Sequence, residues 1–175
     1  MTESAVAADG EWPDFGAARC KMVTWHDPMT LAGSAAGRTG LEFLQALRDG
    51  HLPPPPIVSL MGMNLVSVET GDVVFSCRPD ESVYNPIGVV HGGLVCTLLD
   101  SAAACAVHST LPVDVAYTSV EIKVSYLRPV RGGIELTAHG WVTKPGRRVA
   151  FAEADVRDQS GVILATASTT CLVMG

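Results

Sequence analysis

Regular alternation of apolar and polar residues predicts a β-sheet in the second half of the chain. From Ser119 to Tyr126 the two kinds of residue alternate strictly, which is the period of a strand with one buried and one solvated face. Five other segments are strand-like and are bounded by turn residues: 64–70, 73–78, 134–142, 149–157 and 163–173. Short turns between consecutive strands favour antiparallel pairing.

A different pattern, apolar on nearly every side, runs from Gly92 to His108 and predicts a helix of about four to five turns. Such a helix needs burial on most of its faces, and a sheet wrapped around it provides that burial. A shorter amphipathic helix is predicted from Leu41 to Leu47, with Thr39 as its N-cap. The predicted fold class is therefore α+β: a six-stranded antiparallel sheet around one long central helix, with a short N-terminal helix.

The chain divides into two parts of unequal length. Residues 1–39 show no period and predict an irregular arm, which we expect to pin Trp12, Phe15 and Trp25 onto the body. Residues 40–175 form one domain. Within it, the four prolines at 53–56 predict a stiff extended spacer between a helix and a strand.

Charge and cysteine content exclude several classes of protein. Twelve basic and 18 acidic residues give a net charge of −6 without a basic stripe, which argues against nucleic-acid binding. The uncharged stretches contain prolines and glycines that argue against a membrane span, and no signal peptide is visible. Five widely spaced cysteines without a CxxC pair predict free thiols and a cytoplasmic location: Cys20, Cys77, Cys96, Cys105 and Cys171.

Asp100 is the one carboxylate in the long apolar helix. Its neighbours Leu99 and Ala102 are apolar, and no lysine or arginine lies three or four residues away to pair with it. Burial of an unpaired carboxylate is costly, so a functional role is favoured over the alternative that Asp100 lies on a solvated side of the helix.

The start of the same helix is a second candidate site. Gly92 and Gly93 lie where a helix presents unpaired backbone N–H groups, which can stabilise an oxyanion. The alternative is a turn that needs glycine for backbone reasons alone. His91 is interpreted as a residue that fixes the loop rather than as a general base. No metal is indicated, because no second ligand lies at zinc spacing. Asn85 either forms a turn or donates its amide to a ligand.

Together these residues resemble the PaaI-like branch of the hotdog-fold acyl-CoA thioesterases. The family pattern is an Asn, a His-Gly-Gly six residues later, and an acid nine residues after the histidine. Asn85, His91-Gly92-Gly93 and Asp100 keep both spacings. The segment 118–129 is also similar to the strand that follows in the family. The resemblance covers roughly residues 40–175 and implies that this part is a hotdog thioesterase domain.

The resemblance implies hydrolysis of a thioester to a carboxylic acid and coenzyme A. By position, the Gly92 N–H polarises the thioester carbonyl and Asn85 assists it. Asp100 acts as nucleophile or as general base, Ser119 orients the water or the acid, and His91 steadies the loop.

Substrate contacts and partners follow from the same resemblance. Gly93 and three arginines, Arg128, Arg147 and Arg148, are the candidate substrate-binding residues, the arginines for the phosphates of CoA. Leu94 and Leu98 are expected to line the acyl pocket, and no metal or cofactor is expected. Two alternatives stay open: a hotdog hydratase or dehydratase, and a non-catalytic module that binds acyl-CoA.

One geometric argument is independent of the family. Gly92 and Asp100 are eight residues apart, about 12 Å along one helix. Attack on a carbonyl needs reacting atoms about 3–3.5 Å apart, so one chain cannot bring both residues to one thioester carbon. Either this mechanism is wrong or the site is shared between protomers. The resemblance implies the second, because the family forms dimers in which the opposite subunit donates the acid, so a homodimer or homotetramer is expected.

Overall fold

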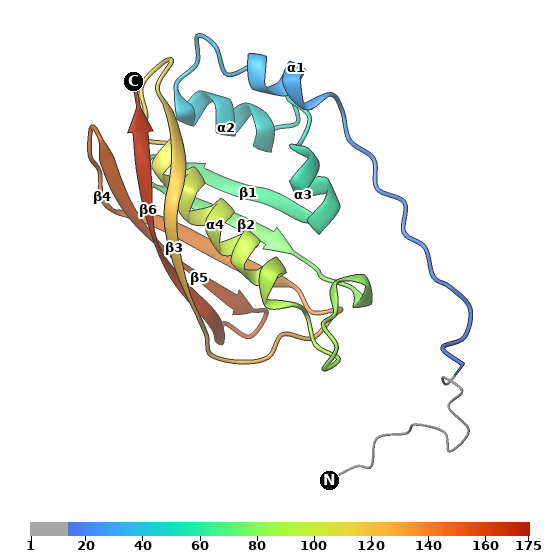
Figure 1. Ribbon diagram of the computed structural model, residues 1–175. Helices are drawn as coiled ribbons and strands as arrows, with labels where there is room; N and C mark the ends of the chain where they lie inside the picture. The colour runs from blue at the N-terminus through green and yellow to red at the C-terminus, as the bar shows by residue number, and fades with distance from the viewer. Residues whose placement is uncertain (1–13) are drawn as a thin grey trace.

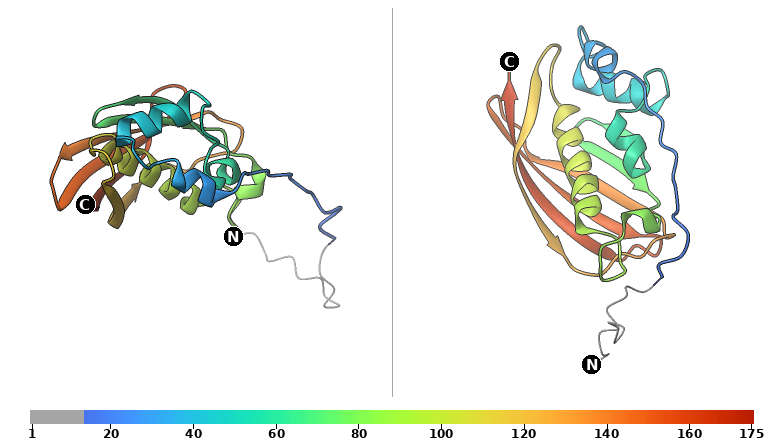
Figure 2. Two further views of the ribbon diagram at one scale, coloured as in Figure 1. Left: turned by 90° about the horizontal axis from the view of Figure 1, so that it is seen from above. Right: turned by 45° about the vertical axis from the view of Figure 1, so that its right-hand side comes forward.

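A single curved sheet forms the frame of the protein. The computed structural model describes residues 14–175, in which six antiparallel strands take the order β1-β2-β4-β5-β6-β3. The strands are β1 (Met63–Glu69), β2 (Asp72–Cys77), β3 (Ala116–Tyr126), β4 (Leu136–Lys144), β5 (Val149–Asp158) and β6 (Ile163–Met174). The sheet curves around one long helix, as Figures 1 and 2 show. The predicted fold class is confirmed.

The central helix α4 (Gly92–His108) lies in the concave face of the sheet and supplies much of the core. Its small residues allow close packing: a Cβ added at Gly140 of β4 would lie 2.3 Å from the Ala102 backbone. A side chain at position 140 would therefore push the helix off the sheet. In the described part of the chain, no helix combines the length and hydrophobicity that a membrane span requires.

Three short helices lie N-terminal to the sheet: α1 (Pro28–Gly33), α2 (Gly40–Arg48) and α3 (Pro56–Met61), and a turn of 3₁₀-helix, η1 (Glu81–Val83), precedes α4. Thr39 caps α2 as predicted, in a capping box with Glu42. Helices α2 and α3 pack on the β1 side of the molecule, beside the open side of α4 (Figure 1).

The N-terminal arm and the proline run differ from prediction. The arm contains α1, which begins at Pro28 after an Asp27 side-chain cap; proline at the first helical position is favourable. For the same reason Pro56 opens α3 instead of extending the spacer. Phe15 and Trp25 do not pack on the body, since they are 85% and 61% exposed. Trp12 lies outside the described residues.

A β-bulge interrupts the strict alternation that was predicted for β3. The pairing of β3 with β6 shifts between Ser119 and Glu121, so that Ser119 pairs with Cys171 and Glu121 with Thr170. A bulge inserts one residue and reverses the side to which the following residues point. Ser119 therefore lies on the inner face that faces α4, whereas uninterrupted alternation would place it on the solvated face with Glu121.

Candidate active site

Asp100 and Ser119 meet between α4 and β3. The Ser119 hydroxyl donates a hydrogen bond of 2.9 Å to Oδ1 of Asp100. Asp100 lies in the middle of α4 and is half-buried, and Ser119 reaches it only because of the bulge in β3. This contact fixes one carboxylate oxygen by a hydroxyl donor and leaves the acid accessible to a ligand.

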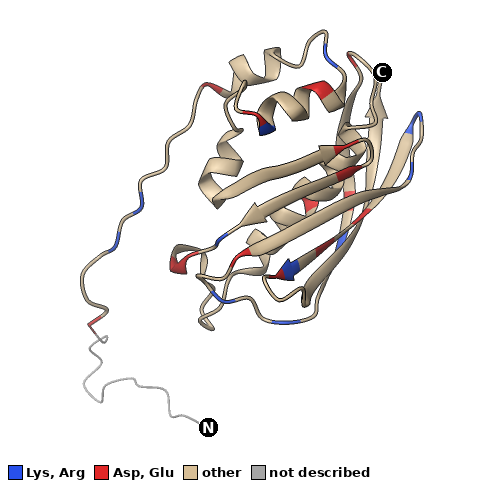
Figure 3. Ribbon diagram, turned by 180° about the vertical axis from the view of Figure 1, so that it is seen from behind, with Lys and Arg blue, Asp and Glu red and all other residues tan. Residues whose placement is uncertain are grey.

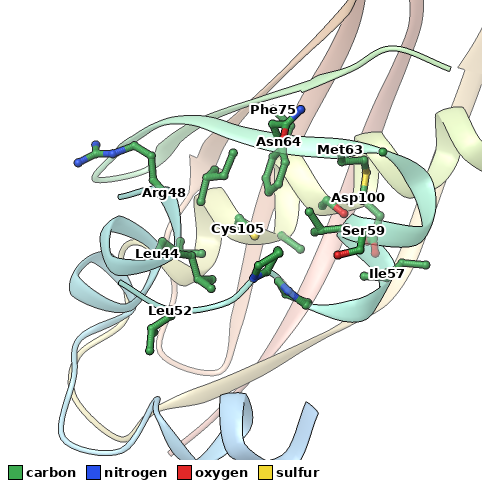
Figure 4. A pocket seen from close by; sticks show the side chains of 18 of the residues that line it. Leu44, Arg48, Leu52, Ile57, Ser59, Met63, Asn64, Phe75, Asp100 and Cys105 are labelled. Carbon is green, nitrogen blue, oxygen red and sulfur yellow. The ribbon is translucent and has the colours of Figure 1, made fainter. Parts of the chain in front are cut away.

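A cavity of about 830 Å³ opens beside this pair. Its apolar walls come from α2, the proline segment, α3 and β2, including Leu44, Pro54, Val58 and Phe75, and Figure 4 shows Asp100 and Cys105 at its α4 side. The proline segment is therefore a wall of the cavity, which the sequence did not indicate. The cavity has the size and lining of a small-molecule site.

Leu94 and Leu98, predicted to line the acyl pocket, do not do so. Their side chains are 3% and 0% exposed and belong to the core between α4 and the sheet. Because a helix presents different residues on each side, the face with Asp100 and Cys105 borders the cavity and the opposite face is buried.

The N-terminus of α4 presents one backbone donor. His91 is the N-cap: its Nδ1 accepts a 2.8 Å hydrogen bond from the Gly93 N–H, so that Nδ1 carries no proton in this arrangement. The Leu94 N–H donates to the His91 carbonyl. Among the described residues the Gly92 N–H has no acceptor. Of the two glycine amides predicted to meet substrate, only that of Gly92 is free, and His91 holds the other.

Tyr126, which the alternating pattern indicates only as an apolar strand position, fixes this helix end. Its hydroxyl donates a 2.9 Å hydrogen bond to the Gly92 carbonyl. A Cβ added at Gly92 would lie 3.1 Å from the ring, so glycine gives the tyrosine room. No spacing rule connects a strand residue to a helix start 34 positions earlier, and only the folded chain reveals this contact.

Asn85 combines the two roles that the sequence left open. Its Oδ1 accepts hydrogen bonds from the N–H groups of Ile87 and Val89, at 3.1 and 3.4 Å, and so shapes the loop before α4. In the described part of the molecule its Nδ2 amide has no acceptor. The side chain therefore holds the turn with its oxygen and keeps a nitrogen donor for a ligand.

The three candidate arginines do not gather in one chain. Arg128 follows β3 near the start of α4 and donates to the Ile163 carbonyl at 2.8 Å. Arg147 and Arg148 lie in the β4–β5 turn, beside Thr110 and Leu111 at the other end of α4. Figure 3 shows these two basic segments well apart, in the β4–β5 turn and in the loop after β3.

The thiols near Asp100 are held in the protonated form. Burial raises the pKa of Cys105 to about 12, and the negative charge of Asp100 adds to the shift. Burial, again with a contribution from Asp100, also raises the pKa of Cys96 and Cys171. Thiolate is the nucleophilic form of cysteine, so these groups are poor nucleophiles at neutral pH. All five cysteines are free, as predicted.

Cys105 also lines the cavity and is the alternative to Asp100 as a nucleophile. Because its thiol stays protonated, we expect Cys105→Ala to keep kcat close to that of the wild type, and iodoacetamide at pH 7.5 to leave activity intact. Steady-state kinetics before and after alkylation measure both effects. A loss of kcat in Cys105→Ala as large as that in Asp100→Asn would assign the chemistry to the thiol.

Two groups of candidate residues thus lie at two places along α4. Asn85, His91 and Gly92 are together at its start, and Asp100 and Ser119 are together at its middle, with about 12 Å of helix between Gly92 and Asp100. A six-stranded antiparallel sheet around such a helix, with an acid at mid-helix and a free amide at the N-terminus, defines a hotdog-fold enzyme of the thioesterase type.

Comparison with known proteins agrees with this class. The thioesterase superfamily model matches residues 87–165. Human acyl-coenzyme A thioesterase 13 is 30% identical over 98 residues, which cover 56% of this chain and 69% of that protein. Among solved structures, a phenylacetic acid degradation-related protein of Ralstonia eutropha JMP134 is 26% identical with a TM-score of 0.68 and covers 74% of this chain and 98% of that chain.

A Streptococcus mutans UA159 protein, solved bound to acetyl CoA, is 26% identical with a TM-score of 0.60, over 65% of this chain and 89% of that chain. The chain belongs to the thioesterase superfamily, among the hotdog-fold acyl-CoA thioesterases, and is classed with the thioester hydrolases. The resemblance seen in the sequence is confirmed.

Proposed function

We propose that the protein hydrolyses acyl-CoA to a free carboxylic acid and CoA, at a site that two protomers share. The observation that carries this proposal is the separation of a free backbone donor, at Gly92, from the Asp100–Ser119 pair on the same helix. The named activity of the human relative and the acetyl CoA bound to the Streptococcus mutans protein support the choice of substrate.

In the proposed reaction, the Gly92 N–H donates to the thioester carbonyl and stabilises the oxyanion that forms on it. Asn85 adds its amide N–H to the same oxygen or to a bound water. Asp100 removes a proton from a water that attacks the carbonyl carbon, or attacks that carbon itself, while Ser119 keeps the carboxylate in position. The C–S bond then breaks, and the sulfur leaves as the thiol of CoA after it takes up a proton. In the second route loss of the thiol leaves an acyl-aspartyl anhydride, which a water then hydrolyses to the free acid and the Asp100 carboxylate. The reaction needs no metal or redox cofactor.

The edge strand β3 supplies the geometry for sharing. Ser119 lies in the first half of β3, and Tyr126, which contacts Gly92, is its last residue. Two copies that pair β3 edges antiparallel, with the twofold axis between Ile122 and Lys123, bring Tyr126 of one protomer beside Ser119 of the other. Each Gly92 donor then lies next to the partner's Asp100, and an open sheet edge is covered at the same time.

The same arrangement gives the arginines a role. Arg128 lies at the Gly92 end of β3 in its own chain, and antiparallel pairing moves the partner's Arg147 and Arg148 toward that end. Because all three side chains are exposed, they are free to reach the phosphates of CoA from both protomers. Gly93 contributes its Cα surface rather than its N–H, which His91 holds.

Thiol release from a panel of acyl-CoAs, detected with a thiol-reactive dye, tests the proposed activity. We expect saturable release by the wild-type protein with at least one acyl group. Binding of acyl-CoA by calorimetry without release from any member of the panel would contradict hydrolysis and indicate a binding module instead. Hydration of an enoyl-CoA without thiol release would indicate a hydratase.

A further inference from the structure

Two cavities lie one after the other along the inner side of β3. The first, of about 830 Å³, contains Asp100 and Ser119. The second, of about 360 Å³, lies beside the end of α4 and the α1–α2 connection, where Phe43 and His108 line it. Of all the described residues that line either cavity, Tyr117 alone lines both. Its side chain therefore stands between them.

An aromatic stack holds Tyr117 in this position. Its ring packs on that of His108, with centroids 4.9 Å apart, and the His108 ring packs on that of Phe43 at 5.6 Å. The three rings come from β3, α4 and α2. Together they form an aromatic partition between the two cavities, and because three elements hold it, the Tyr117 ring has little freedom to move.

The partition is neutral at physiological pH. Burial raises the pKa of Tyr117 well above its ordinary value, so that the phenol keeps its proton. Burial lowers the pKa of His108, so that its imidazole is uncharged. An uncharged aromatic wall suits the end of a site for an apolar chain.

Tyr117 also lies at a suitable distance from the reacting groups. It precedes Ser119 by two residues, about 7 Å along the strand. Cys105, which lines the first cavity together with Tyr117, is five residues beyond Asp100, about 7.5 Å along α4. An acyl chain whose carbonyl carbon lies at Asp100, and which extends along α4 away from Gly92, meets the Tyr117 ring within the first cavity.

We propose that Tyr117 ends the acyl-binding cavity and sets the longest acyl chain that the protein hydrolyses; this inference rests on the proposed thioesterase function. Removal of the ring joins the two cavities, and a longer chain then enters the space beside Phe43 and His108. Each further methylene buried there raises kcat/KM by about fourfold, from the free energy of burying one methylene group.

The test measures kcat/KM of the full chain for saturated straight-chain acyl-CoAs of increasing length. In Tyr117→Val, which keeps a strand-forming residue, we expect the maximum to move to longer chains. Tyr117→Phe retains the ring and is the matched control, with the chain-length profile of the wild type. Tyr117→Trp places a larger ring in the partition, and we expect the maximum of kcat/KM to move to shorter chains. This variant is a second test of the inference if circular dichroism shows that Tyr117→Val does not fold.

The outcomes separate this inference from the proposed function. If the wild type hydrolyses acyl-CoAs and every folded Tyr117 variant keeps its profile, the inference is wrong and the function stands. If the wild type releases no thiol from any chain length, the proposed function fails and the inference fails with it. Opposite shifts in Tyr117→Val and Tyr117→Trp, with none in Tyr117→Phe, establish the role of the ring.

Discussion

Asp100→Asn is expected to lower kcat by about 100-fold or more while the protein keeps its fold and its affinity for acyl-CoA. The amide has nearly the same shape as the carboxylate and still accepts the hydrogen bond from Ser119 through its oxygen. It neither attacks a carbonyl carbon effectively nor removes a proton from water. The loss therefore falls on kcat, with little change in the dissociation constant.

Thiol release gives kcat and KM, and calorimetry with an acyl-CoA gives binding to the variant. Asp72→Asn is a suitable control, since Asp72 pairs with His139 on strands β2 and β4, outside the cavity. We expect that variant to turn over like the wild type. Turnover by Asp100→Asn at a near-normal rate would remove Asp100 from the mechanism.

Gly92→Pro is expected to reduce kcat by about 100- to 1000-fold, which is the usual cost of deleting one oxyanion donor. Proline removes the free N–H and is accepted at the first position of a helix, where Gly92 lies. His91 already has the extended conformation, with φ −62° and ψ 135°, that the residue before a proline requires. The helix therefore keeps its start, and the variant loses the donor but gains a Cβ beside Tyr126.

Gly92→Ala is the matched control, because it adds the Cβ that meets Tyr126 at 3.1 Å but keeps the N–H. We expect its loss of kcat to be smaller than that of Gly92→Pro by about a factor of ten or more. Equal losses in the two variants would mean that crowding of Tyr126, and not the missing donor, affects catalysis. Circular dichroism of both variants checks that α4 is intact.

Much of the fold is predictable because its two kinds of element have distinct periods. Alternating residues predict the strands, and the run from Gly92 to His108 predicts a buried helix. The short helix at Pro56 escapes prediction because the proline run is interpreted as a helix breaker, although proline is a favourable first residue. The one at Pro28 escapes because residues 1–39 show no period. Periodicity identifies an element by its middle and carries little information on how it begins.

The candidate site is less predictable, because local sequence does not contain long-range contacts. The motif spacing indicates Asn85, His91, Gly92 and Asp100, but alternation alone places Ser119 on the solvated face, and only the bulge brings it to Asp100. The use of the Gly93 amide by His91 depends on a rotamer that no pattern encodes. The cavity wall formed by the proline segment depends on how α2 and α3 pack beside α4.

Subunit mixing tests most directly the central claim that each site joins Gly92 of one protomer to Asp100 of another. Asp100→Asn and Gly92→Pro proteins, each nearly inactive, are mixed in equal amounts under conditions of subunit exchange, which is verified by co-purification through a tag on one of them. Half of the dimers are then mixed, and each mixed dimer has one site with both groups intact.

Shared sites predict recovery to about a quarter of wild-type thiol release, since one site in four is complete at random pairing. Sites that lie within one chain contain a defect in every protomer and predict no recovery. Activity of the exchanged mixture that stays at the sum of the two variants would contradict the shared site.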